Sequence, residues 1–415
     1  MNFKARIRFV FTGFGLFLYL FVLPQVSTPG ADTTSDTVNT ESRSYQLYSE
    51  KNWNKLIQFD REAISRGQDY FYIRLRTGIG LFEQKKYRAA LTQLRVALEF
   101  NARDETALEY LYYCYLYSGR FEEARKLNWK KLPAVSAITF EYGNKSSDSS
   151  RLFHNANYIN AGLEQYINNR FSLFHAFTWF GQTELVGAKI QLQYYIRANI
   201  PLKNNFLFSP AFQYVFSSFV PVPPPDGIPM NPPGTPPPPS NPPPINQNYF
   251  IFSFLLTKHM PWLDIGIGST AVFADSSSGG AKNTSTQYIN DLKIVLYPLQ
   301  NNRIAVGCDG IIHSANAYQS VSNAFSPFLS VWPHTKINVL VNYFRNQGMN
   351  TIENNGYLVN NSNDFTRTRW TAICSYTLNR HLAIYALYEL ENNIEEYQGF
   401  RYNYTLMGAG IRIMP

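Results

Sequence analysis

The sequence predicts an all-β transmembrane antiparallel barrel of about fourteen strands, preceded by a small all-α helical domain. Three observations lead to this fold class. Residues 131–415 alternate between polar and apolar side chains, their segments run for about 10 to 15 residues, and short connections alternate with longer ones. Soluble strands average about 5 to 6 residues, whereas a strand that crosses a membrane needs about 9 to 11. Segment length therefore favours a membrane barrel over a soluble β-sandwich or jelly roll, which also alternate.

The alternation is clearest in residues 367–376. One parity carries Arg367 and Arg369, and the other carries Trp370 and Cys374. Successive side chains of a strand point to opposite faces, so this segment has one polar face and one face that suits lipid. Tyrosine and phenylalanine are dense near the segment ends, where a membrane barrel carries its aromatic girdles.

Fourteen segments of this kind follow one another along the barrel region. Short turns join every second pair, as at 168–170 and 333–335, whereas most alternate connections are longer, as at 275–286 and 347–364. Bacterial barrels have short periplasmic turns and longer external loops, and this chain enters the barrel from the short-turn side. We therefore expect the outer membrane of a Gram-negative bacterium, with the helical domain in the periplasm. The predicted strands lie near residues 134–143, 153–166, 171–180, 183–198, 204–218, 247–259, 262–275, 285–297, 303–315, 323–332, 336–345, 365–377, 381–392 and 400–414.

A proline-rich segment, residues 220–244, interrupts the barrel region and holds fourteen of the 24 prolines. Proline cannot donate a backbone hydrogen bond, so this segment favours extended polyproline geometry over a strand. The order of the connections predicts that it lies outside the cell. It is a loop insertion that the barrel tolerates, a segment that binds a partner, or a segment that folds across the mouth of the barrel.

Charge, cysteine content and motifs exclude several classes of function. The net charge of +8 is spread along the chain without a basic stripe, so we expect no nucleic-acid partner. Cys114, Cys308 and Cys374 are widely spaced and odd in number, which indicates neither a disulfide framework nor a metal site. The six histidines lack the spacing of paired ligands, and no nucleophile elbow or P-loop is present. We therefore expect no catalytic residues, no metal, no cofactor and no enzymatic activity.

Two segments precede the helices. Residues 1–31 begin with basic side chains, continue with the apolar run Phe9–Leu23 and end in small residues, which is the layout of a secretory signal peptide. The run is short for a membrane-spanning helix, which needs about 20 apolar residues, although a retained anchor is the alternative. The polar linker, residues 32–44, is predicted to be disordered.

Residues 45–130 have helical periodicity and an internal repeat of 34 residues. The repeat, together with residues 83–91 and the small residue Gly78, resembles that of tetratricopeptide proteins, whose unit is a helix-turn-helix of this length. The resemblance implies a groove that binds proteins; the alternative is a helical plug or spacer. The groove candidates are Tyr72, Ile79, Tyr113 and Leu116. Positions one period apart carry matching side chains, namely Trp53, Tyr87 and Phe121, then Leu47, Leu81 and Tyr115, then Leu56, Ala90 and Ala124.

Charged residues inside the predicted strands are expected to line the lumen or its rims. An arginine or lysine facing lipid costs roughly 2 to 4 kcal/mol at the bilayer midplane. Their mixed signs argue against strong ion selectivity, and they either line an open channel or close the lumen through salt bridges. These pore-lining candidates are Lys189, Arg197, Asp264, Asp291, Lys293, Arg303, Asp309, Arg367, Arg369 and Glu389.

Signal peptide, tetratricopeptide-like helices and barrel together resemble the outer-membrane porins of exopolysaccharide secretion. The resemblance is one of architecture and transfers no site residues. It implies a channel or exporter in outer-membrane lipid, with helices that recruit a periplasmic protein partner or guide a substrate such as a polysaccharide. The alternative is a closed barrel that acts as a surface interaction or anchoring protein of an envelope complex.

Overall fold

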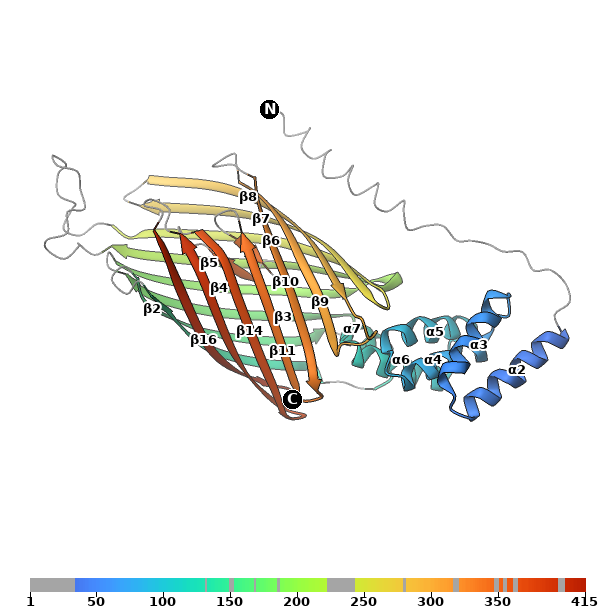
Figure 1. Cartoon of the computed structure of the whole chain (residues 1–415). Coiled ribbons are helices and arrows are strands. Elements are labelled where there is room, and N and C mark those ends of the chain that lie inside the picture. The colour runs from blue at the N-terminus through green and yellow to red at the C-terminus, as the bar shows by residue number, and fades with distance from the viewer. Residues whose placement is uncertain are drawn as a thin grey trace, which may run out of the picture.

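A computed structural model describes most of the chain (Figure 1). The predicted signal peptide and residues 222–242 of the proline-rich segment lie outside the described residues. The described ranges are 34–130, 133–148, 153–167, 169–184, 187–221, 243–278, 281–315, 321–346, 351–353, 357–360, 365–394 and 400–415.

Between residue 34 and the barrel the structure describes six helices, and the starts of α3, α5 and α7 recur with the predicted period of 34 residues. Helix-to-helix turns also repeat, because Lys51, Lys85 and Gly119 all have left-handed backbone, with φ of 54°, 60° and 69°. The repeat positions Leu56 and Ala90 are fully buried between the helices, as is Ala124. The helices are α2 (Thr34–Ser49), α3 (Trp53–Ser65), α4 (Phe71–Glu83), α5 (Tyr87–Phe100), α6 (Glu105–Tyr117) and α7 (Phe121–Lys126).

The prediction of a disordered linker at 32–44 is wrong for its described part. Helix α2 covers most of it, although the segment is polar. Ser44 is fully buried, the Thr40 hydroxyl donates to Gln68 at 2.6 Å, and Glu41 pairs with Arg76. Packing against α3 and α4 therefore orders a sequence whose composition alone favours disorder.

The remaining chain forms a closed antiparallel barrel of fourteen strands, which confirms the predicted fold class and strand count. Each strand pairs with its neighbour along the chain, and β1 pairs with β16 to close the ring. Two further short strands, β12 (Thr351–Glu353) and β13 (Leu358–Asn360), form a separate hairpin between β11 and β14 that the sequence did not predict. The barrel strands are β1 (Val135–Ser147), β2 (Phe153–Ile167), β3 (Phe171–Glu184), β4 (Gly187–Pro201), β5 (Phe206–Pro221), β6 (Ile245–His259), β7 (Leu263–Ser278), β8 (Ala281–Leu296), β9 (Ile304–Ala315), β10 (Val321–His334), β11 (Ile337–Asn346), β14 (Phe365–Asn379), β15 (Leu382–Ile394) and β16 (Arg401–Ile413).

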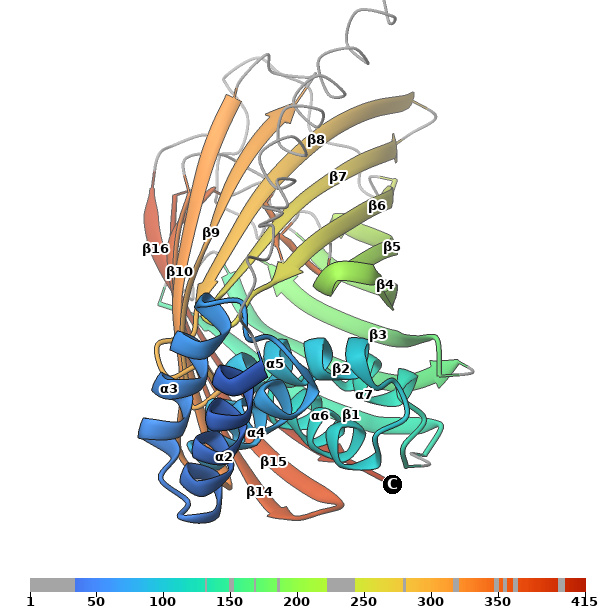
Figure 2. The same ribbon diagram turned by 90° about the vertical axis from the view of Figure 1, so that its right-hand side faces the viewer.

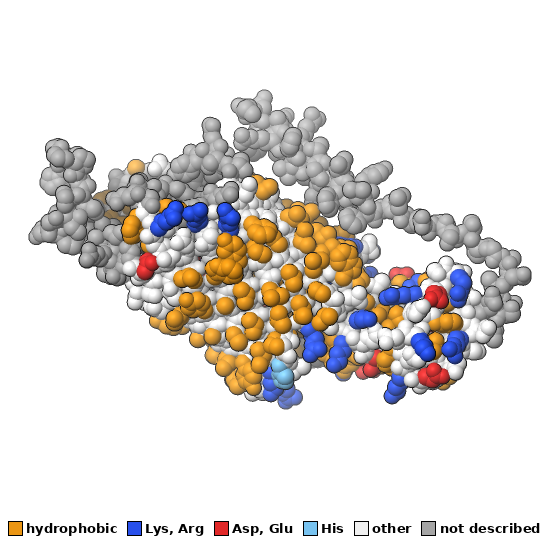
Figure 3. Space-filling model, viewed as in Figure 1, with side chains coloured by type: hydrophobic (Ala, Val, Ile, Leu, Met, Phe, Trp, Pro, Cys, Tyr) orange, Lys and Arg blue, Asp and Glu red, His pale blue; other side chains and the backbone are white. Residues whose placement is uncertain are grey.

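The outer face of the barrel is an apolar band. Large apolar side chains such as Phe252, Leu292 and Trp370 are exposed on it, and they alternate with inward-facing residues. Figure 3 shows these side chains as an orange field with basic side chains at both of its ends. An apolar outer wall between polar rims is the surface that a lipid bilayer requires, so this is a membrane barrel of the outer-membrane type.

The helices sit at the short-turn end of the barrel, over its mouth (Figures 1 and 2). The two longest connections, from Pro221 to Ile245 and from Asn346 to Phe365, join strands at the opposite end. Several short turns use asparagine in left-handed conformation, as at Asn169 and Asn204, because asparagine tolerates that backbone. Because short turns mark the periplasmic end of a bacterial barrel, the helical domain is periplasmic. None of the described helices combines the length and hydropathy of a membrane-crossing helix.

Candidate functional site

The inner wall of the barrel carries a strip of apolar side chains. One residue comes from each of seven neighbouring strands, β5 to β11, and all are buried. Neighbouring side chains contribute to this burial, since Tyr249 packs against the strip and the Arg369 guanidinium lies near the Phe344 ring. We call this set the apolar strip: Val215, Ile251, Val272, Ile289, Ile311, Ala324 and Phe344.

A charged wall continues the apolar strip around the ring. Phe344 pairs in register with Arg369, whose guanidinium carbon lies 4.8 Å from the Phe344 ring centroid. Arg369 Nε is 3.5 Å from Glu389 Oε2, and Lys145 Nζ is 2.5 Å from Glu391 Oε2. Each of these ion pairs joins strands that are neighbours or one apart in the ring. Lys293 Nζ of β8 lies 3.3 Å from Asp309 Oδ2 of the neighbouring strand β9, so none of these three ion pairs among the described residues spans the lumen.

The hairpin β12–β13 does span the lumen. It leaves the wall between β11 and β14, yet its Tyr357 packs against Phe174 and Tyr195 on β3 and β4, with ring centroids 5.8 and 5.0 Å apart. Gln213 Nε2 on β5 donates to the Tyr357 carbonyl at 3.4 Å. Strands β3 to β5 lie on the far side of the ring from β11 and β14, so this hairpin crosses the barrel.

At the periplasmic mouth, helices α5 to α7 bind four of the short turns. Arg120 and Arg95 both donate to Asn205 in the turn before β5, and Lys126 Nζ donates to the Pro201 carbonyl at 2.5 Å. Further bonds reach the turns after β2, β6 and β8. The helices are therefore fixed to the β2–β9 side of the mouth.

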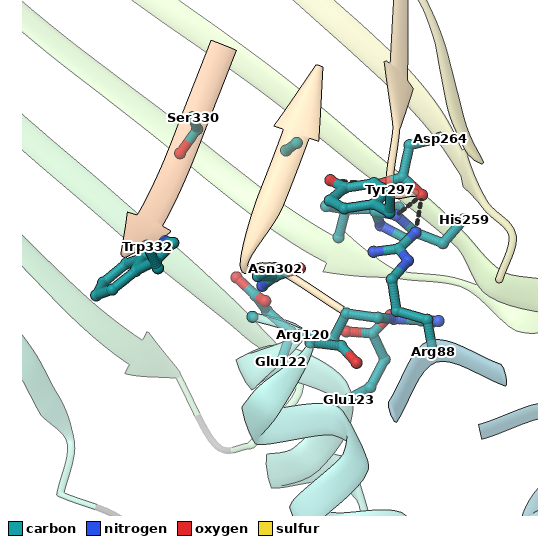
Figure 4. Close-up of a pocket in the computed structure, with 14 residues that line it drawn as sticks. Arg88, Arg120, Glu122, Glu123, His259, Asp264, Tyr297, Asn302, Ser330 and Trp332 are labelled. Carbon is teal, nitrogen blue, oxygen red and sulfur yellow. Dashed lines mark hydrogen bonds and ion pairs between the residues drawn. The ribbon is translucent and has the colours of Figure 1, made fainter. Parts of the chain in front are cut away.

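A cavity of about 310 Å³ lies between the helices and the lumen, and Figure 4 shows its polar lining. Arg88 of α5 reaches to Asp264 at the start of β7, and both side chains are buried, with 3% and 8% exposed. The Tyr297 hydroxyl donates to Asp264 Oδ2 at 3.0 Å, and the Arg88 guanidinium lies 3.8 Å from the Tyr297 ring centroid. His259 Nδ1 is 3.1 Å from Asp264 Oδ1. This cluster is a closed polar contact between the two domains.

A second contact at the mouth joins a carboxylate to neutral hydrogen-bond donors. The Ser172 hydroxyl of β3 donates to Glu122 Oε1 of α7 at 2.7 Å, and Asn199 Nδ2 of β4 donates at 3.2 Å. Burial raises the pKa of Glu122, against the opposing effect of the Ser172 hydrogen bond. The neighbouring carboxylates Glu123 and Glu164 act in the same direction as burial.

The strands place eight of the ten pore-lining candidates on the inner face by parity, but two differ. Arg303 lies exposed in the turn before β9, at the periplasmic rim of the barrel rather than inside the lumen. Arg367 is exposed on the outer side because the β14 register shifts between Thr366 and Thr368, which the simple alternation cannot foresee. The eight inward residues are Lys189, Arg197, Asp264, Asp291, Lys293, Asp309, Arg369 and Glu389.

The four groove candidates do not form one surface. Ile79 is buried in the helical core, because its side chain points between the helix pairs rather than toward solvent. Leu116 and Tyr113 pack against the same core, and Tyr113 also stacks on Tyr117. Only Tyr72 is largely exposed, with Arg76 close to its ring. The prediction of a groove through Ile79 is therefore wrong.

Sequence reasoning missed Arg88, Tyr357 and Lys145. Arg88 follows the repeat position Tyr87 directly and precedes two buried alanines, and a charge in that place is the signal that marks it. Tyr357 belongs to strands too short to show alternation. Among the described residues, no three His, Cys, Asp or Glu side chains are grouped to hold a metal ion.

Comparison with known proteins finds similar solved structures but no family. No family model matches the sequence, and no curated protein matches it significantly. Similar solved structures include the Ralstonia pickettii toluene transporter TbuX, with 11% identity, a TM-score of 0.43, and coverage of 68% of this chain and 90% of that one. The P. putida toluene transporter TodX has 9% identity and a TM-score of 0.41, covering 72% and 92%. A Pseudomonas aeruginosa FadL homologue has 9% identity and a TM-score of 0.41, covering 68% and 90%.

These scores assign neither a family nor a substrate to the chain. The resemblance to exopolysaccharide porins rests on the order of domains in the sequence.

Proposed function

We propose that this outer-membrane barrel is a gated, non-enzymatic channel for small apolar or amphipathic molecules. The observation that carries the proposal is the apolar strip, since the interior of a porin is normally polar. An apolar molecule that enters such a wall leaves water at a gain of roughly 25 cal/mol per Å² buried. A sugar polymer gains little there, so the apolar strip favours apolar cargo over a polysaccharide.

The way in which the lumen is obstructed supports a gated channel rather than a permanently sealed barrel. The described ion pairs on the inner wall link nearby strands and do not bridge the lumen. Among the described residues, the hairpin β12–β13 crosses the lumen and the helical domain covers part of the periplasmic mouth. The hairpin contacts β3 to β5 only through Tyr357 in the described residues, by ring contacts and one hydrogen bond. Displacement of the hairpin would widen the path through the lumen without breaking the barrel wall, and the helices leave part of the mouth uncovered.

Single-channel conductance in planar bilayers tests this proposal. Three full-length proteins are compared: the wild type, Tyr357→Ala, and a variant whose residues 351–360 are replaced by a glycine-serine linker. We expect a mostly closed wild type and longer open times in both variants. Phe250→Ala, which removes an aromatic side chain from the outer face, is the matched control and should leave gating unchanged.

The cargo is tested by block of the current through the variant whose residues 351–360 are replaced. We expect 1-naphthol to block at far lower concentration than the tetramer of N-acetylglucosamine, and Ile251→Ser to weaken that block. Block by the sugar alone would overturn the apolar cargo and restore polysaccharide transport.

A closed barrel that anchors an envelope complex is the second candidate function. The buried contact between Arg88 and Asp264 favours it, because it ties the helices to the mouth. Under this proposal the helical domain recruits a periplasmic protein and the lumen conducts nothing. Silent bilayers with all three proteins, despite folded barrels that shift on heating in gels, would favour the anchor and overturn the channel.

A further inference from the structure

Three arginines form a row on the outer surface of the barrel at its external end. Arg345 of β11, Arg367 of β14 and Arg401 of β16 are all exposed. Their chain neighbours Phe344, Thr366 and Tyr402 are buried and face inward, so the arginines face outward. We call these three residues the arginine row.

The strand register brings the arginine row together. Arg345 pairs with Thr368, the residue after Arg367, and Arg401 pairs with Ile394 on the intervening strand β15. At about 4.8 Å per strand, the row spans about 15 Å along the barrel edge. Figure 3 shows basic side chains in a row over this part of the barrel, directly above the apolar surface.

An aromatic pair marks the level of the row in the membrane. Tyr343 and Trp370 pack on the outer face with ring centroids 4.6 Å apart, two and three residues along their strands from the arginines. Aromatic rings of this kind settle at the level of lipid headgroups. The arginine row lies just beyond them, where the polar heads of outer-leaflet lipids begin.

Within the described residues, no carboxylate pairs with Arg345, Arg367 or Arg401. Asp148, at the nearby end of β1, is bonded to Asn403 instead, at 2.9 Å to its backbone nitrogen and 2.8 Å to its amide. Guanidinium groups bind phosphate through two parallel hydrogen bonds, which a planar fork suits better than an ammonium group does.

We propose that the arginine row binds the phosphate groups of a phosphorylated lipid in the outer leaflet. The site goes beyond transport, because it lies on the outer wall and shares no residue with the lumen. Its span suits a headgroup that carries more than one phosphate, or two headgroups side by side. The bound lipid would fix the depth and tilt of the barrel at this edge.

Native mass spectrometry of the purified full-length protein tests the site with three probes: diphosphoryl lipid A, the same lipid after dephosphorylation, and inorganic phosphate. We expect the wild type to bind the phosphorylated lipid about tenfold more tightly than the dephosphorylated one. Millimolar inorganic phosphate should not displace it. Equal binding of the two lipids would overturn the proposal, and displacement by inorganic phosphate would assign a free-anion site instead.

Variants separate the arginine row from general basicity. R345Q/R367Q/R401Q should lose the preference for the phosphorylated lipid, whereas K336Q/R380Q, at the periplasmic turns, should keep it. R345K/R367K/R401K keeps the charge without the fork and should bind with intermediate affinity. If the glutamine variant does not fold, the binding of the phosphorylated and the dephosphorylated lipid to the wild type still tests the proposal. Loss of the preference in K336Q/R380Q as well would overturn the assignment to this row.

Discussion

At the scale of single residues, the contact between Arg88 and Asp264 joins two domains through charges that water hardly reaches. Breaking a buried pair on one side leaves an unpaired charge, which costs about 3 to 5 kcal/mol. Removing both charges costs much less, because nothing is left unpaired. The pair is therefore a strong test of whether the helices are held to the barrel.

We expect Arg88→Gln to destabilise the docked helices by about 3 kcal/mol or more. Thermal unfolding of the full chain in detergent micelles measures this. Arg74→Gln is the control, since Arg74 pairs with the half-exposed Asp69 at the surface and should cost about 1 kcal/mol at most. R88M/D264N should recover much of the loss. Equal effects of Arg88→Gln and Arg74→Gln would mean that the interface is not closed.

Glu122 should make docking depend on pH. Because burial raises its pKa above the ordinary value of 4.5, the docked state holds the proton more tightly than a released helix does. Its contribution is complete below about pH 4.5 and is lost as the pH rises through the raised pKa. We expect protease cleavage between helices and barrel to be faster at neutral pH than in acid, and Glu122→Gln to remove the difference.

Asp60 provides the comparison for Glu122. Burial raises the pKa of Asp60 to about 6, but this residue lies within the helical domain, where Thr77 donates to it at 2.8 Å. Asp60→Asn should change unfolding of the helices with pH and leave the cleavage difference in place. If Asp60→Asn abolishes that difference, the pH dependence belongs to the helical fold and not to docking.

At the scale of elements, Gly78 sets how closely α4 and α5 approach. A Cβ on Gly78 would lie 2.7 Å from the Leu94 side chain, whereas one on Gly80 would meet its neighbours at 3.4 Å or more. We expect Gly78→Ala to destabilise the helical domain by about 1 to 3 kcal/mol through overpacking. Gly80→Ala should be neutral or stabilising by up to about 1 kcal/mol, since alanine favours helix.

Circular dichroism of the full chain at 222 nm during thermal unfolding distinguishes the two variants. A loss of stability in both would show that any side chain in this turn of α4 is harmful. A gain in both would mean that Leu94 moves aside without cost.

The elements that the sequence predicted are those whose pattern repeats. Fourteen strands followed from alternation, and the helix pairs followed from matched positions such as Trp53 and Tyr87. Helix α2 was missed because a few buried contacts order it, and the hairpin β12–β13 because three-residue strands show no period. Ile251 in the apolar strip was missed because it stands between Phe250 and Phe252, where no alternation is visible.

The candidate site was less predictable than the fold. Strand parity places Arg369 and Glu389 on the inner face, and the sequence predicted this from the cost of a charge in lipid. Contacts between domains have no comparable pattern in the sequence. Arg88 and Asp264 meet only because the helices dock on the turns of the barrel. The bulge at Arg367 is likewise a local event without a sequence period.

At the scale of the whole molecule, the outer face of the barrel meets lipid, and the depth of its residues in the bilayer can be measured. Phe252 is 52% exposed near the middle of β6, and Val220 is 49% exposed at the external end of β5. We expect Phe252→Lys to cost about 2 to 4 kcal/mol and Val220→Lys about 0 to 1, because the penalty depends on depth in the bilayer. Urea unfolding in phospholipid vesicles measures both. Equal costs would place the two residues at the same depth.

The closure of the ring also has a consequence for biogenesis. Ile138 in the first strand pairs with Ile413 in the last, so the ring cannot shut until nearly the whole chain has been delivered. The turns to which the helices bind belong to strands from the earlier part of the chain, and the helices are synthesised before the barrel. The docked helices can thus hold the early strands together before the first and last strands pair. Pairing of residues that are far apart in sequence is slow, and this arrangement reduces the number of conformations to be searched.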